Sequence, residues 1–250
     1  MDIYVQSFLN IGEAKVMVRK EMQVTAKQVK RGLIGVTTRE RLTNSTLVIN
    51  EAGEKVLLFL KSYISQEMIA NLTEDVRREK FMTMAKKKKE TSRGDVQGVY
   101  FGRWEELGQG SYHWTLSTKK EEGKRFIYRN SKVWTRAARA LKWLDPQCYE
   151  EVQKGKHSLF GRVFSFAVVN LQCKFKLHRD YRDYKWCCIM PFGEFQGGEV
   201  ELPFLGIEVQ AKAGDVLFIR SSKSWHSVKE NTGKRGSVVL TTHCNVLQEK

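Results

Sequence analysis

The 250-residue sequence predicts an α+β protein whose second half is an antiparallel β structure. The pattern changes near residue 158, where charge-rich helical segments mixed with short strands give way to closely spaced β-type runs. Glycines separate these runs, which indicates many short strands joined by tight turns and a closed or sandwiched architecture with its site at one mouth. The expected strands, most of them rich in β-branched or aromatic residues, are 163–171, 186–192, 199–203, 207–211, 216–220, 224–228 and 237–242.

Before residue 158, apolar residues recur with helical spacing. The range 54–71 has such a stripe, and Thr73, followed by two acidic residues, is a candidate N-cap for a helix over about 74–85. A further helix is expected over 132–144, with Pro146 ending it.

The chain is strongly basic, with 43 Lys and Arg against 28 Asp and Glu and a formal charge of +15. This balance favours a polyanionic partner, nucleic acid ahead of an anionic membrane surface, although charge that serves only solubility is the alternative. The run Lys86–Lys89 is expected in an exposed loop because like charges repel, with phosphate contact or nuclear localisation as other roles. The stretch 44–53 is also expected to be a loop.

The cysteines and the hydropathy indicate an intracellular, reducing compartment, with the nucleus as one candidate. The five cysteines, at positions 148, 173, 187, 188 and 244, include no CxxC pair, so we expect thiols packed as small apolar groups rather than a structural zinc site. No apolar stretch reaches the length of a membrane span, and no signal-peptide pattern is present.

Two histidines and a carboxylate form the clearest chemical motif. The motif His178-Arg179-Asp180 is followed later in the chain by a second histidine, His226. Two imidazoles and one carboxylate are the ligand set of a facial-triad Fe(II) site, which leaves open positions on the metal. The i, i+2 spacing places His178 and Asp180 on the same side of an extended segment. Asp183 is the rival ligand, but its spacing breaks this pattern.

A candidate anion clamp follows the second histidine. Arg235-Gly236-Ser237 places a guanidinium and a hydroxyl at i, i+2 on an expected strand, where together they can bind a carboxylate. Arg220 is the rival clamp, and Arg235 is favoured because Ser237 accompanies it.

Aromatic residues alternate with basic ones after residue 93, as stacking on bases beside phosphate contacts requires. The alternative is that the aromatic rings fill the core beneath two strands. His243, near Arg235 in sequence, is either a pocket residue or a structural histidine. The candidate substrate or nucleic-acid residues are Arg93, Tyr100, Arg103, Trp104 and His243.

The order of these motifs resembles the Fe(II)- and 2-oxoglutarate-dependent dioxygenases. The matching segments are His178-Arg179-Asp180, Gly197-Gly198-Glu199-Val200-Glu201-Leu202-Pro203, Gly214-Asp215-Val216-Leu217-Phe218, His226 and Arg235-Gly236-Ser237. Within that superfamily the chain is most similar to the TET/JBP-type nucleic-acid base oxygenases. The cues for that branch are Val169-Asn170-Leu171, Pro191-Phe192-Gly193-Glu194-Phe195 and the arginine after the distal histidine.

The resemblance implies a double-stranded β-helix (jelly-roll) core with N-terminal helices packed outside it. It implies one dioxygenase domain over 1–250, with an N-terminal helical and substrate-side elaboration at 1–157 and the core at 158–250. By position, His178, Asp180 and His226 would bind Fe(II), while Arg235 and Ser237 would bind the distal carboxylate of 2-oxoglutarate. Ascorbate is a candidate supporting reagent, and a monomer is expected.

The implied reaction is oxidation of a methyl or C–H group on a nucleobase, DNA ahead of RNA, with 5-methylcytosine or thymine as the type of substrate. The chain lacks the cysteine-rich zinc-binding region of animal TET proteins and any sign of the DNA-binding module of JBP proteins, which leaves the base open. A hydroxylase of protein side chains or small metabolites is the alternative enzyme. A nucleic-acid-binding module without catalysis is the third interpretation.

Overall fold

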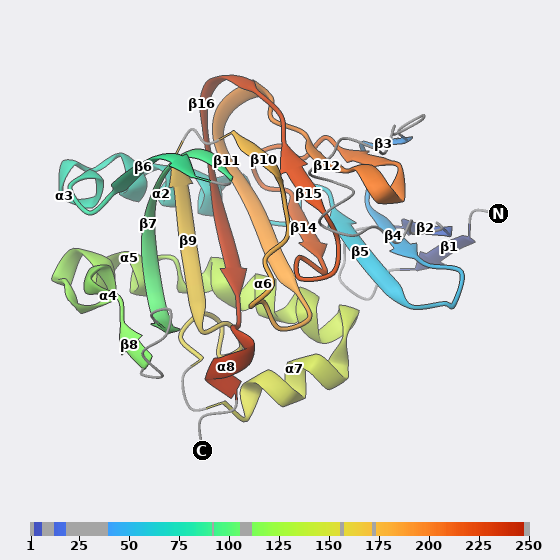
Figure 1. Ribbon diagram of the computed structural model, residues 1–250, viewed down its shortest axis with the longest axis horizontal. Coiled ribbons are helices and arrows are strands. Elements are labelled where there is room, and N and C mark those ends of the chain that lie inside the picture. Colours follow the sequence, from blue (N-terminus) through green and yellow to red (C-terminus); the bar gives the residue numbers. More distant parts are fainter. Residues whose placement is uncertain are drawn as a thin grey trace.

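The computed structural model describes residues 3–6, 13–18, 40–91, 93–105, 112–155, 158–171 and 174–247. Two β-sheets face each other, and helices cover the outer face of the larger sheet (Figure 1). The larger sheet has, in order, β1 (Ile3–Gln6), β2 (Glu13–Val18), β4 (Thr46–Ile49), β5 (Lys55–Leu60), β14 (Val216–Ile219), β11 (Cys187–Gly197), β16 (Asn231–Thr241), β9 (Phe166–Leu171), β7 (Gly94–Glu105) and β6 (Lys86–Thr91), and β8 (Tyr112–Trp114) pairs with β7.

The smaller sheet lies on the opposite side from the helices. Its order is β10 (Phe175–His178), β15 (His226–Val228), β12 (Val200–Leu202), β13 (Ile207–Val209) and β3 (Glu40–Leu42). The helices are α2 (Gln66–Arg77), α3 (Glu79–Met82), α4 (Leu116–Lys119), α5 (Glu121–Arg129), α6 (Ser131–Leu144), α7 (Pro146–Gln153) and α8 (Cys244–Leu247), with a 3-10 turn at Pro203–Leu205.

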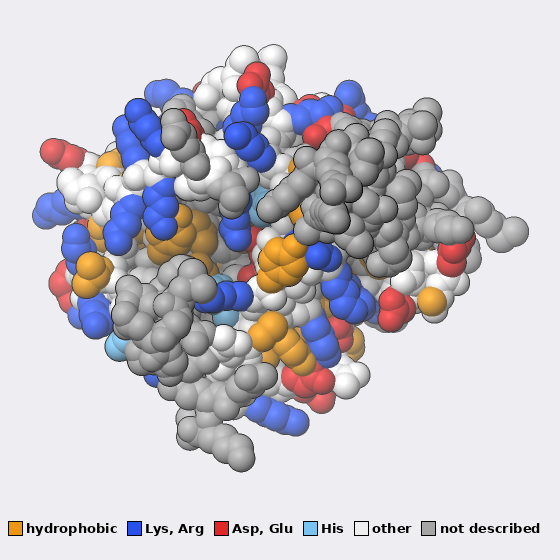
Figure 2. Space-filling model, viewed as in Figure 1, with side chains coloured by type: hydrophobic (Ala, Val, Ile, Leu, Met, Phe, Trp, Pro, Cys, Tyr) orange, Lys and Arg blue, Asp and Glu red, His pale blue; other side chains and the backbone are white. Residues whose placement is uncertain are grey.

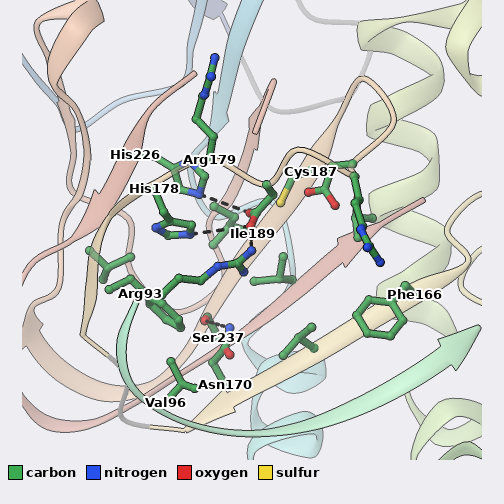
Figure 3. Close-up of a pocket in the computed structure, with 18 of the residues that line it drawn as sticks. Arg93, Val96, Phe166, Asn170, His178, Arg179, Cys187, Ile189, His226 and Ser237 are labelled. Carbon is green, nitrogen blue, oxygen red and sulfur yellow. Dashed lines mark hydrogen bonds and ion pairs between the residues drawn. The ribbon is translucent and has the colours of Figure 1, made fainter. Parts of the chain in front are cut away.

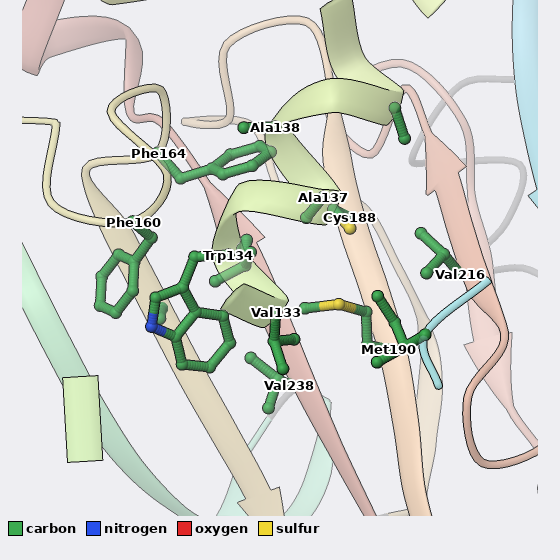
Figure 4. Packing of buried hydrophobic residues seen from close by; sticks show 14 of the residues in the cluster. Val133, Trp134, Ala137, Ala138, Phe160, Phe164, Cys188, Met190, Val216 and Val238 are labelled. Carbon is green, nitrogen blue, oxygen red and sulfur yellow. The ribbon is translucent and has the colours of Figure 1, made fainter. Parts of the chain in front are cut away.

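Strand alternation divides the apolar side chains of the larger sheet between two cores. One set packs against the helices, as Figure 4 shows for Cys188, Met190 and Val238 beside Val133 and Trp134 of α6. The other set packs between the two sheets. The adjacent cysteines illustrate the division, because Cys188 belongs to the helix-side core and Cys187 to the core between the sheets. The described cysteines are free thiols, as expected.

The predicted α+β class is confirmed, and each of the seven expected β runs overlaps a strand: β9, β11, β12, β13, β14, β15 and β16. Strand β11 continues to Gly197, beyond the expected 192, and β16 begins at Asn231, before the expected 237. The helix expected over 132–144 is α6. Strand β10, which ends at the first histidine of the metal motif, is an additional strand of only four residues.

Other expectations in the first half are wrong. The stripe at 54–71 is strand β5 followed by α2, because residues 56–60 are buried on both faces and such an apolar run imitates a helical pattern. Thr73 lies inside α2, and Ser65 is its N-cap. The expected loop at 44–53 contains β4. The prediction for Pro146 is right, because α6 ends at Leu144, and Pro146 also begins α7.

The lysine run is also not a loop. Lys86–Lys89 belong to β6, the last strand in the order of the larger sheet, and all four side chains are exposed. An edge strand leaves one side open to water, which lets consecutive charges remain solvated within a strand.

The division at residue 158 remains a prediction. Strands β4, β5 and β7, which precede it, join the same sheet as β11 and β16, which follow it. Among the helices of the described residues, none is long and apolar enough to cross a membrane.

Leu57→Ala and Leu58→Ala should each lower the free energy of unfolding by about 2–5 kcal/mol, because each leucine is fully buried in a different core. Urea denaturation of the two single variants measures this. A loss below about 1 kcal/mol in either variant would contradict the burial of both faces of β5.

Candidate functional site

Two neighbouring strands of the smaller sheet bring two histidines together. His178 is the last residue of β10 and His226 the first residue of β15, and the two are partners in the antiparallel register. Their ring centroids lie 4.3 Å apart. The pairing of β10 with β15 therefore brings two potential metal ligands from distant parts of the sequence into contact.

Asp180 follows β10 in a turn held by backbone hydrogen bonds. Its N–H donates to the carbonyl of Ser221 (3.0 Å), and its carbonyl accepts from the N–H of Asp183 (2.9 Å). Its carboxylate oxygens lie 3.9 Å from Nε2 of His178 and 3.6 Å from Nε2 of His226. Figure 3 shows His178 and His226 side by side at the cavity.

The other ring nitrogen of each histidine contacts a backbone carbonyl. Nδ1 of His178 lies 2.7 Å from the Lys176 oxygen, and Nδ1 of His226 lies 3.1 Å from the Ser224 oxygen. A carbonyl only accepts, so each Nδ1 donates to its carbonyl and each Nε2 is left on the side of Asp180, where it can bind a metal. Burial, together with the neighbouring His226, lowers the pKa of His178 to about 4, which keeps its ring neutral near pH 7.

This donor set fits Fe(II). The ligand atoms of His178, Asp180 and His226 all lie within 4.8 Å of one another. Two imidazole nitrogens and one carboxylate suit a divalent first-row metal. The three side chains line a cavity of about 360 Å³, so one side of the group is open to small molecules.

Arg93 contacts the same carboxylate. Its Nη2 lies 2.6 Å from Oδ1 of Asp180, and Figure 3 shows its side chain extending into the cavity. Burial alone would raise the pKa of Asp180, but the interaction with His226 and the charge of Arg93 hold this pKa well below its usual range. The carboxylate is therefore ionised, as a metal ligand must be.

Arg235 and Ser237 line the same cavity from β16, two residues apart and hence on one face. Arg235 is 2% exposed and Ser237 3% exposed, and Asn170 Nδ2 lies 3.5 Å from the Ser237 hydroxyl. A guanidinium and a hydroxyl on one face of a strand, both sheltered from water, can bind a carboxylate through charge-assisted hydrogen bonds. The arrangement therefore fits a co-substrate dicarboxylate.

Glycine between these two residues is dictated by close packing. A Cβ on Gly236 would lie 2.2 Å from the ring of Phe192, so a larger residue there would force either that ring or the strand that carries Arg235 and Ser237 to shift.

Both rival residues have other contacts. The guanidinium of Arg220 lies 5.2 Å from the centre of the Trp186 ring, and Arg220 is not among the described residues that line the cavity. Asp183 does line it, but its carboxylate accepts a hydrogen bond from Ser221 (2.6 Å) and lies 3.9 Å from Nε2 of His243. Burial, then the charge of Asp180, raises the pKa of Asp183 to about 7.

The candidate substrate residues differ in whether they line the cavity. Arg93, Tyr100 and His243 line the cavity, whereas Arg103 is not among the described lining residues. Trp104 lies on β7, but its side chain is outside the described part of the structure. Alternation separates Tyr100, in the cavity, from Phe101, in the helix-side core. Core packing therefore holds for Phe101, and the stacking role of Tyr100 stays a prediction.

Several lining residues were not singled out from the sequence. Asn170, Arg179 and Tyr181 line the cavity, together with the apolar side chains of Val96 and Phe166. Arg179 sits between the histidine and aspartate of the metal motif, a position that could have indicated its place at the cavity.

Comparison with known proteins supports the fold. No protein-family model matches the chain, and no curated protein matches it by sequence. The chain is similar to the structure of NgTET1 in complex with 5mC DNA, at a TM-score of 0.73 and 16% identity over 94% of this chain and 84% of that one. It is also similar to a 2OG-Fe(II) oxygenase family oxidoreductase from Burkholderia pseudomallei, at a TM-score of 0.50 and 13% identity over 76% and 85% of the two chains.

The chain therefore has the jelly-roll fold of the 2-oxoglutarate- and Fe(II)-dependent oxygenases, as its motifs predicted. Within that fold, a TET structure matches it over nearly its whole length.

Asp180→Ala should weaken binding of a divalent metal by more than about 100-fold, because the site loses its only negative ligand. Titration calorimetry with Mn²⁺ in place of Fe(II) measures the affinity without oxidation. Asp183→Asn is the matched control, since its amide oxygen can still accept from Ser221. A larger effect of Asp183→Asn than of Asp180→Ala would reverse the ligand assignment.

Proposed function

We propose that this protein is an Fe(II)- and 2-oxoglutarate-dependent dioxygenase that oxidises a methyl or C–H group on a nucleobase, with DNA ahead of RNA as the substrate. The observation that carries the proposal is the convergence of the His178, Asp180 and His226 group and the buried Arg235 in one cavity. A metal-ligand set alone could be structural, but a buried arginine beside it is suited to a carboxylate co-substrate.

In this proposal His178, Asp180 and His226 hold Fe(II) through two Nε2 atoms and one carboxylate. The carbonyls of Lys176 and Ser224 fix the histidine rings through Nδ1, so the ligands keep their orientation during turnover. When bound, Fe(II) and 2-oxoglutarate supply the oxidation of a C–H bond by O₂, while the protein positions the reactants and excludes water.

Arg235 and Ser237 bind the distal carboxylate of 2-oxoglutarate. The Arg235 guanidinium offers a charged partner in a position sheltered from water, where a charge-assisted hydrogen bond is strong. Asn170 orients the Ser237 hydroxyl. This places the co-substrate against the larger sheet and leaves the side of the cavity near Arg93, Tyr100 and His243 for the substrate.

Three observations support a nucleobase. The chain carries a net charge of +15, the cavity has apolar and aromatic walls that suit a flat ring, and the fold is similar to that of NgTET1, which was solved with 5mC DNA. A base inside a duplex must leave the stack to reach such a cavity, unless the substrate is single-stranded.

The test is mass spectrometry of nucleosides after incubating methylated DNA or RNA with the protein, Fe(II), ascorbate and 2-oxoglutarate. An oxidised base that disappears in His178→Ala is the expected result. Consumption of 2-oxoglutarate that peptides or small metabolites stimulate, and nucleic acids never do, would replace this proposal with a hydroxylase of those substrates. Metal binding without turnover of any substrate would leave a binding module.

Arg235→Ala should raise the 2-oxoglutarate concentration for half-maximal turnover by about 10- to 100-fold, because a charged hydrogen-bond partner of the carboxylate is lost. Initial rates at varied 2-oxoglutarate measure this. Arg220→Ala is the control, because Arg220 contacts Trp186 instead of the cavity. Equal shifts in the two variants would contradict the assignment of Arg235 as the clamp.

A further inference from the structure

The edge strand β6 presents its lysines to two different faces of the larger sheet. Lys86 is paired with Gly98 and Lys88 with Val96, and Val96 lines the site cavity. Directly paired residues of antiparallel strands point to the same side of a sheet, so Lys86 and Lys88 project on the cavity face. Lys87 is paired with Gln97, which lines a second cavity on the other face.

A row of rings leads from β6 into the cavity. The Lys88 ammonium lies 5.7 Å from the centre of the Tyr100 ring. The Tyr100 and Phe166 rings are 6.3 Å apart, and the Phe166 and His243 rings 4.9 Å apart. Over β6, β7 and β9, Figure 2 shows Lys and Arg side chains beside a hydrophobic patch. Positive charge at the sheet edge is therefore continuous with aromatic surface inside the cavity.

A second cation stands between two rings elsewhere on the cavity lining. The guanidinium carbon of Arg179 lies 4.7 Å from the Tyr181 ring centre and 5.0 Å from the Trp225 ring centre. Arg179 also donates to the Tyr181 hydroxyl (3.2 Å), which fixes the tyrosine. Tyr181 is nonetheless 61% exposed, so its ring is accessible to a base from solvent.

We propose that the strand carrying the target base runs from the cavity face of β6 across the cavity mouth to Tyr181. Lys86 and Lys88 neutralise its phosphates, and a base that flanks the target stacks on Tyr181. The chemistry is that of single-stranded nucleic-acid sites, where cations follow the backbone and aromatic rings take the bases. This inference rests on the proposed nucleobase substrate and specifies how the polymer is held.

Protection of the sheet edge is the competing role for these lysines, since charged residues on an edge strand prevent pairing with other chains. Edge protection requires lysines equally on both faces of β6. Phosphate binding at the cavity requires only those on the cavity face, and Lys87 lies on the opposite side.

The experiment measures binding of a fluorescent single-stranded oligodeoxynucleotide to the full chain by anisotropy over a series of salt concentrations. The test variant is Lys86→Ala/Lys88→Ala. The control is Lys87→Ala/Lys234→Ala, which removes the same charge from the face of the second cavity, where Lys234 is a lining residue. All four lysines are exposed, so the fold should be retained, and thermal melting of each variant checks this.

The test variant should bind more weakly than the wild type. The slope of its log K against log salt should be smaller in magnitude by about 1.4, because each phosphate contact on a single strand contributes about 0.7. The control should keep the wild-type slope. Tyr181→Ala should weaken binding about tenfold with an unchanged slope, because a ring carries no charge, and Tyr181→Phe should restore it.

Equal losses of slope in the two lysine pairs would show attraction by charge alone and overturn the proposal. No loss in either pair would leave β6 with edge protection only. In both cases the proposed nucleobase oxidation would stand, because binding is measured without Fe(II) and 2-oxoglutarate. A wild-type protein that binds no oligonucleotide even at low salt would instead remove the nucleic-acid substrate itself.

Discussion

The alternation of side chains along β16 is the constraint on which the site depends. Val238 and Leu240 enter the helix-side core, while Arg235 and Ser237 point into the cavity on the opposite face. The helix-side core thus fixes the strand whose other face binds the co-substrate in our proposal. The charged and hydroxyl groups stay in place because their neighbours in sequence are locked in apolar packing.

How much of this could be predicted from the sequence depended on where each segment is buried. Apart from β10, the strands after residue 160 were predictable because short β runs are separated by glycines, and α6 because one of its faces is polar. Strand β5 was not, since burial on both faces removes the period of two that marks a strand. Charge likewise hid β6, because no local rule shows that a lysine run lies at a sheet edge.

The site also has features that could be predicted from the sequence and features that could not. His178, Asp180 and His226 could be grouped from their order and residue types, and the structure brings their ligand atoms together. The place of Arg93 on the Asp180 carboxylate could not be predicted, because it depends on the packing of β10 beside β7, strands far apart in the sequence. Long-range contacts of this kind leave no periodic signal in the residues that make them.

The ion pair between Arg93 and Asp180 has a thermodynamic consequence. Arg93 lies in the turn that joins β6 to β7, so this one contact anchors the edge strand to a proposed metal ligand. A metal ion and the Arg93 guanidinium would both interact with the Asp180 carboxylate. Their free energies of interaction with it are therefore linked. The linkage is reciprocal. If metal binding changes the free energy of ordering this turn, then ordering the turn changes the free energy of metal binding by the same amount.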